Sequence, residues 1–128
     1  MENLNVRELM IGNYVKQKHP TKYIITAITK EGGWIELTDG FETIDSDIDN
    51  IEPIPLTEDI LLKCGFVKST MVEGCFIHNK HERLYVSIIN PIAKHFGNKN
   101  GVLVMIDYLH TLQNLYFALT NEELTIKL

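Results

Sequence analysis

The segment Ile51–Phe66 constrains the fold most, because it ends one kind of structure and begins another. Pro53 and Pro55 have no backbone N–H to donate, so the chain there is predicted to be extended and to lie at an edge. Thr57 is a suitable N-cap for a helix whose first turn holds two acidic residues. Gly65 can end that helix in the left-handed conformation. The segment therefore predicts a break in the chain followed by one short helix.

Before this break, short β-branched and aromatic runs alternate with Gly, Pro and Asp turns, as in a meander of strands. The expected strands are Tyr14–Val15, Tyr23–Ile28, Trp34–Leu37 and Phe41–Ile44, and one helical turn is expected at Ile48–Ile51. This layout predicts an SH3-like small β-barrel lobe over residues 1–56, with no longer helix.

After the break, the pattern mixes helix and strand signals, so residues 57–128 are predicted to form a helix-plus-antiparallel-sheet lobe packed against the first. The overall class is then α+β. The unbroken apolar run Val102–Ile106 suggests a central strand covered on both faces. The remaining expected elements are a helix over residues 58–64, strands Cys75–His78 and Leu84–Ile89, a turn at Gly97–Gly101, a helix from Tyr108 to Leu119 capped by Asp107, and a closing strand over 124–128.

The composition limits the class of partner. The chain has 128 residues and a net charge of −5, and its twelve Lys and Arg are scattered, which argues against general nucleic-acid binding. No apolar run approaches the roughly 20 residues that span a bilayer, so no membrane contact is expected. The N-terminal residues lack a secretory pattern, and two cysteines are too few for a disulfide framework. A cytoplasmic location is the expectation.

Two metal sites are conceivable, and both fit poorly. Asp45–Asn50 begins like a calcium loop, but position six is Asn50 and position twelve is Leu56, where a glycine and a bidentate glutamate are needed. These acidic residues are better explained as solvent-exposed side chains of a loop. No metal and no other cofactor are expected.

Cysteine and histidine ligands for zinc occur at Cys64, Cys75, His78 and His81, but their spacing is unfavourable. On a strand, Cys75 and His78 point to opposite faces. A Cys–His nucleophilic pair also stays open, because such residues meet only in the fold. Both cysteines lie in apolar patterns that suggest structural roles, so catalytic residues are not assigned and enzyme activity is not expected.

The predicted C-terminal helix carries the candidate binding residues. One face presents an apolar stripe for the core, made of Tyr108, Leu112, Leu115 and Leu119 and flanked by Leu109 and Tyr116. The opposite face carries an aromatic side chain among hydrogen-bonding ones, which is a composition typical of interfaces. The predicted partner-binding residues are His110, Gln113, Asn114 and Phe117. The alternative is that the helix is covered on both sides by its own chain.

Four stretches of this sequence resemble a family of small uncharacterised proteins from gut-bacterial prophage and mobile-element regions. They are Leu9–Val15, Ile51–Thr57, Ile60–Phe66 and, most specifically, His110–Leu124, and the likeness covers nearly the whole chain. Members of that family often have Gly where Asn121 stands here, and Asn is also suited to a left-handed helix end. The resemblance implies no activity, cofactor or site residue.

These observations favour a non-catalytic binding or adaptor protein of phage or mobile-element type, acting through contacts with a protein partner or as a homo-oligomer. The alternative is a binder of a small anionic ligand such as a nucleotide, held by His, Asn and Lys side chains from the turns. A hydrolase with an unrecognised site is a third class. An exposed aromatic surface, a polar pocket and perturbed ionisable groups, respectively, distinguish the three.

Overall fold

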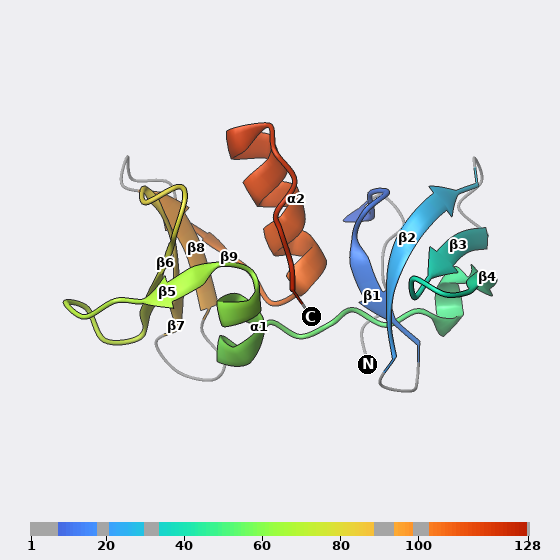
Figure 1. The fold of residues 1–128 in the computed structure, drawn as a ribbon, viewed down its shortest axis with the longest axis horizontal. Helices are drawn as coiled ribbons and strands as arrows, with labels where there is room; N and C mark the ends of the chain where they lie inside the picture. The colour runs from blue at the N-terminus through green and yellow to red at the C-terminus, as the bar shows by residue number, and fades with distance from the viewer. Residues whose placement is uncertain (1–7, 18–20, 30–33, 89–93, 99–102, 128) are drawn as a thin grey trace.

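The computed structural model describes residues 8–17, 21–29, 34–88, 94–98 and 103–127. These residues form two antiparallel sheets and two α-helices, so the predicted α+β class is confirmed. The two sheets stand apart, with the C-terminal helix between them (Figure 1).

The first sheet has four strands in the order of the sequence, paired antiparallel. Its strands are β1 (Tyr14–Lys16), β2 (Lys22–Ile28), β3 (Trp34–Thr38) and β4 (Thr43–Asp47). The predicted helical turn is confirmed as the 3-10 helix η2 (Ile48–Asn50), where the Asp47 carboxylate accepts a hydrogen bond from the Asp49 amide at 3.0 Å. The chain then returns to β1 through one antiparallel bridge, Lys16–Glu52. Among the described strands, β1 and β4 lie at the two edges of the sheet and do not pair with each other, so the sheet is open and an SH3-like barrel is not confirmed.

Alternation along these strands builds a small core on one side of the sheet, since successive side chains point to opposite faces. Ile25 on β2 and Ile35 and Leu37 on β3 are fully buried. The other buried members of this cluster are Leu9, Val15, Tyr23 and Ile51.

The helix after the break, α1 (Glu58–Lys63), forms as its sequence predicts. The Thr57 hydroxyl accepts a hydrogen bond from the Ile60 amide at 3.2 Å, and Gly65 follows the helix with φ +86°. A side chain at Gly65 would be strained by that positive φ. Ile60 and Leu61 face a second, larger core.

The second sheet contains β5 (Phe66–Lys68), β6 (Cys75–His78), β7 (Leu84–Ile88), β8 (Lys94–Asn98) and β9 (Leu103–Met105), antiparallel in that order. The predicted strand Cys75–His78 is recovered as β6, and Leu84–Ile88 of the predicted strand Leu84–Ile89 is recovered as β7, while Ile89 lies outside the described residues. The expectation for Val102–Ile106 is wrong, because β9 is an edge strand in which Met105 is 65% exposed. β5 and β8 were not predicted, and β8 runs through Gly97 and Asn98, which suggested a turn.

The C-terminal helix α2 spans Leu109–Thr120 and ends at Asn121, whose φ of 58° is left-handed as expected. Two predictions about it are wrong. The N-cap position belongs to Tyr108 and not to Asp107, and no side chain caps the first turn. The predicted closing strand is absent from the described residues after the helix, although the Lys127 amide donates to the Lys63 carbonyl at 2.9 Å. Leu128 lies outside the described residues.

The core-facing side of α2 follows the predicted stripe except at its C-terminal end. Leu112 and the flanking Leu109 and Tyr116 are buried as predicted, whereas Leu119 is 46% exposed. Leu115 packs partly against the same core. Because α2 is contacted by both halves of the chain, its buried surface is wider than a single stripe. Neither helix in the described part of the chain is long and apolar enough to cross a membrane.

Candidate functional site

The predicted binding face of α2 lies against the first sheet, and two of its amide side chains contact the backbone of the N-terminal segment. The Gln113 Oε1 atom accepts from the Tyr14 amide at 2.8 Å, and its Nε2 donates to the Gly12 carbonyl at 3.0 Å. Asn114 donates to the Glu8 carbonyl at 2.7 Å and accepts from the Asn13 side chain at 2.8 Å. We call this set of hydrogen bonds the amide clasp.

The N-terminal segment has the conformation that the amide clasp requires. Asn13 accepts a hydrogen bond from the Met10 amide at 2.8 Å through its side chain, which closes a tight turn. Gly12 adopts φ +95° within that turn, a conformation that other residues rarely adopt. A Cβ atom there would also come within 3.3 Å of the Glu123 carboxylate. The turn at residues 10–13 therefore depends on Gly12.

His110, the third predicted binding residue, is fully buried at the same junction. Its Nε2 lies 3.4 Å from the Glu8 carboxylate, and its ring stacks on Tyr108 with 5.9 Å between ring centroids. Its Nδ1 has no hydrogen-bond partner within the described structure. Burial lowers the pKa of His110, and the Glu8 carboxylate opposes that shift. A buried histidine in this position is neutral at pH 7.

Phe117, the fourth predicted residue, lies beside the clasp and is 38% exposed. It lines a cavity of about 230 Å³ between the two halves of the chain. Apolar side chains supply much of the wall, and Met10 and Ile11 are exposed at its rim. The other lining residues are Gly12, Asn13, Tyr14, Ile24, Gln113, Asn114, Glu123, Leu124 and Ile126. Glu123 is the charged member of this set. The structure thus brings together all four predicted residues, three engaged within the chain and Phe117 open to the cavity.

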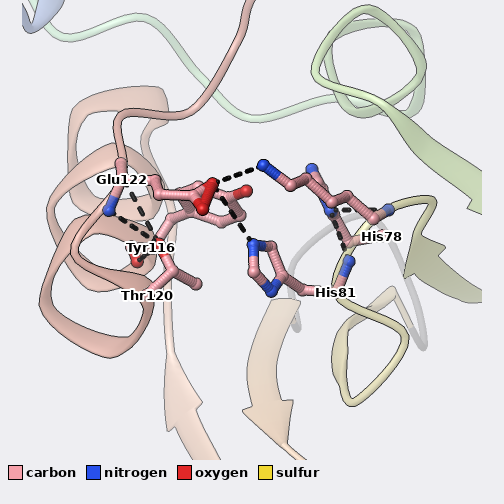
Figure 2. Close-up of polar contacts among 6 residues, drawn as sticks. His78, His81, Tyr116, Thr120 and Glu122 are labelled. Atoms are coloured by element: carbon pink, nitrogen blue, oxygen red, sulfur yellow. Dashed lines mark hydrogen bonds and ion pairs between the residues drawn. The ribbon is translucent and has the colours of Figure 1, made fainter.

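A second cluster lies where the turn after β6 meets the end of α2. The sequence pattern indicates only its two histidines, His78 and His81, as poorly spaced zinc ligands. Figure 2 shows His78 and His81 near Tyr116, and the ring centroids of both histidines are within 5.5 Å of the Tyr116 centroid. His78 Nδ1 accepts from the Lys80 and His81 amides at 3.2 and 3.1 Å, so this nitrogen is unprotonated. Burial lowers the pKa of His78, and the neighbouring His81 lowers it further. His78 is thus a structural acceptor for the turn.

Glu122 joins this cluster from the loop after α2. Its carboxylate accepts a hydrogen bond from Lys80 Nζ at 2.7 Å and lies 3.6 Å from His81 Nε2 (Figure 2). The Lys80 ammonium holds the pKa of Glu122 below its usual range. The Thr120 hydroxyl donates to the Tyr116 carbonyl at 2.8 Å and accepts from the Glu122 amide at 3.1 Å, which fixes the loop. We call His78, His81, Tyr116, Glu122 and Lys80 the histidine cluster.

Two hollows flank the Lys80–Glu122 ion pair. One, of about 480 Å³, is lined by Lys80, His81 and Arg83 together with Glu82, Leu84, Leu119 and Thr120. The other, of about 560 Å³, contains Lys63, Asn79 and Lys127 among its lining residues, together with Glu122 and Glu123. Both hollows mix cations with carboxylates, so neither has a strongly positive wall.

Neither the cysteines nor the acidic loop assembles a metal or nucleophilic site within the described residues. No group of three or more His, Cys, Asp and Glu side chains converges there to hold a metal ion. Burial raises the pKa of Cys64 to about 12, which is opposite to the shift that a nucleophilic thiol needs. Cys75 and His78 point to opposite faces of β6, as their spacing predicted.

Comparison of the chain with protein-family models, with curated proteins and with solved structures finds no match.

Proposed function

We propose that this is a non-catalytic binding protein whose cavity, between the first sheet and the C-terminal segment with α2, receives an apolar side chain of a protein partner. The observation that carries the proposal is Phe117, a partly exposed aromatic side chain beside a cavity whose rim bears Met10 and Ile11. Exposed apolar groups around a recess, bordered by polar side chains, are typical of the anchoring positions of interfaces. The cavity volume of about 230 Å³ suits one side chain better than a whole cofactor.

The charge of the cavity supports a more specific partner. The side-chain amides of Gln113 and Asn114 already bond within the chain, so the wall offers mainly apolar contact. Glu123 adds a carboxylate, and the whole chain carries a net charge of −5. A segment with a large apolar residue next to Lys or Arg would match both features, whereas an anion would be repelled.

A peptide-selection experiment tests the proposal. A random peptide library is selected on the immobilised protein, and enriched peptides are measured by fluorescence anisotropy against three proteins: wild type, Phe117→Ala and Leu119→Ala. Leu119 is the matched control, since it lies on the same helix and is similarly exposed but does not line the cavity. We expect apolar–basic peptides whose affinity falls at least tenfold for Phe117→Ala and stays unchanged for Leu119→Ala. Equal affinity for wild type and Phe117→Ala would refute the assignment.

A small anionic ligand is the second candidate function. It is supported by Lys80, His81 and Arg83, which line one hollow beside the histidine cluster. Lys80 already forms an ion pair with Glu122, and Glu82 lines the same hollow. An anion must therefore compete with these carboxylates for the cationic side chains. Thermal-shift titration with inorganic phosphate and with ATP, against sodium chloride at equal ionic strength, tests this function. A saturable rise in melting temperature that Arg83→Gln removes supports it, and no rise beyond the salt control excludes it.

Three broader assignments remain proposals. The resemblance of His110–Leu124 and the other stretches supports a phage or mobile-element type. The bridge between Lys16 and Glu52 supports an SH3-like relationship of residues 1–56, packed against a second lobe at 57–128. The presence of only two cysteines in the chain supports a cytoplasmic location.

A further inference from the structure

A hollow on the outer face of the first sheet adjoins the cavity proposed above as the binding site. Its volume is about 390 Å³, and Tyr14, Ile24 and Ile126 line both spaces. Tyr14 pairs with Ile24, and Ile24 pairs with Thr38, so these three side chains lie in a row across β1, β2 and β3. Lys22 is two residues from Ile24 on β2 and shares that face. A segment bound in the cavity can therefore continue along the hollow.

The C-terminal segment supplies another part of the wall of this hollow, and its backbone is held in place. Leu124 is buried in the larger core, and Ile126 packs partly against the same core. The Lys127 amide donates a hydrogen bond to the Lys63 carbonyl at 2.9 Å. These contacts anchor residues 124–127, so the Lys127 side chain lines the hollow from a fixed backbone position.

The charged side chains that line the hollow are Lys22, Lys127 and Asp39. Neither ammonium group has an ion-pair partner within the part of the chain that the structure describes. The Asp39 carboxylate accepts hydrogen bonds from the Glu42 and Phe41 amides, both at 2.8 Å, and these bonds hold its pKa below the usual range. Because this carboxylate is engaged by its own loop, the hollow offers two cations that are open to a ligand.

The two adjoining spaces therefore differ in the sign of their charge. Glu123 lines the cavity, whereas Lys22 and Lys127 line the hollow. The hollows beside the histidine cluster lack this separation, because Lys80 there is paired with Glu122 at 2.7 Å. Separated charges of opposite sign select partners with the complementary arrangement. Building on the function proposed above, we propose that this hollow binds an acidic side chain of the same partner segment whose apolar residue enters the cavity.

The register of the sheet sets the spacing between the two contacts. Lys22 and Ile24 are two residues apart on β2, which corresponds to about 7 Å along the strand. Because Ile24 lines both spaces, an extended segment reaches the lysines within roughly two to four residues of its apolar anchor. The partner segment thus has its basic residue beside the anchor, near Glu123, and its acidic residue further along.

Fluorescence anisotropy with peptides enriched from the random library on the wild-type protein tests the proposal. The peptides are amidated at their C-terminus, so that an acidic side chain is their source of negative charge. Combined Lys22→Gln and Lys127→Gln should weaken binding on the order of fivefold, since exposed ion pairs contribute modestly, and added salt should reduce the difference. Lys68→Gln is the matched control, because its side chain is 63% exposed on the other sheet and does not line the hollow.

A charge reversal locates the contact. Lys22→Glu should weaken binding of the selected peptide and should favour a peptide in which Lys replaces the acidic residue. Circular dichroism melting confirms that the variants fold. Enriched peptides that have no acidic residue at this spacing overturn the proposal, and so does equal binding by wild type and both lysine variants.

The outcomes also separate this proposal from the cavity assignment. Binding that Phe117→Ala weakens and the lysine variants do not refutes the acidic contact alone. Binding that the lysine variants weaken and Phe117→Ala does not refutes the cavity assignment alone. A selection that enriches no peptide overturns both.

Discussion

Replacing Gln113 by alanine should show that this predicted partner-binding residue holds the two halves of the chain together. The change removes the acceptor for the Tyr14 amide and the donor for the Gly12 carbonyl, at 2.8 and 3.0 Å. Each such hydrogen bond contributes about 0.5–1.5 kcal/mol net, so Gln113→Ala should cost roughly 1–3 kcal/mol of unfolding free energy. Alanine is the better helix former, so a loss of helix propensity cannot explain the change.

Urea unfolding followed by circular dichroism measures this cost. With a slope of about 2 kcal/mol per molar urea, a loss of about 2 kcal/mol lowers the midpoint by roughly 1 M. Gln113→Glu refines the test, because it keeps the acceptor but points a carboxylate at the Gly12 carbonyl. The folded-state pKa of that carboxyl should be raised, so this variant should gain stability relative to wild type as the pH falls from 7 toward 4. Unchanged stability in Gln113→Ala would refute the role of the amide clasp.

The other predictions concern the core, pH and metals. Leu112→Ala should cost about 2–5 kcal/mol by urea unfolding, because Leu112 is fully buried, whereas Leu119→Ala should stay within about 0.5 kcal/mol, and equal losses would contradict the orientation of α2. Burial lowers the pKa of His78 and of His110. The unfolded chain therefore binds more protons just below about pH 6.5, and stability should fall as the pH drops through that window, whereas a flat profile from pH 7.5 to 5 would contradict the shifts. Purified protein should carry no stoichiometric zinc or calcium by elemental analysis, and EDTA should leave its melting temperature unchanged.

Local rules explain which elements could be predicted from the sequence. α1 was predictable because Thr57 and Gly65 act on their own immediate neighbours. β8 was missed because Gly97 and Asn98 favour a turn locally, while pairing with Tyr85 and Leu84 on β7 holds them extended. β9 was assigned to the wrong place in the sheet, because an apolar run does not distinguish a central strand from an edge strand.

The binding face of α2 was only half predictable for a similar reason. The sequence indicated that Gln113, Asn114 and Phe117 would lie off the main apolar stripe, and that this face needed a cover. It could not indicate whether the cover is a partner or the same chain, because the contacts join residues 99 to 106 positions apart. The histidine cluster was missed because Glu122 and Tyr116 reach the 78–81 turn only through tertiary packing.

The amide clasp also affects the order in which the chain can fold during its synthesis. Residues 10–13 are synthesised early, whereas Gln113 and Asn114, which form hydrogen bonds with this segment, are synthesised about 100 residues later. At a translation rate of about 5–20 residues per second, the N-terminal segment waits roughly 5–20 s for them. Throughout that interval Met10 and Ile11 lack the helix beside them, so the nascent chain exposes apolar surface that chaperones can bind. The N-terminal segment beside the first sheet is therefore covered only after α2 has been synthesised, even if the strands of that sheet have already paired.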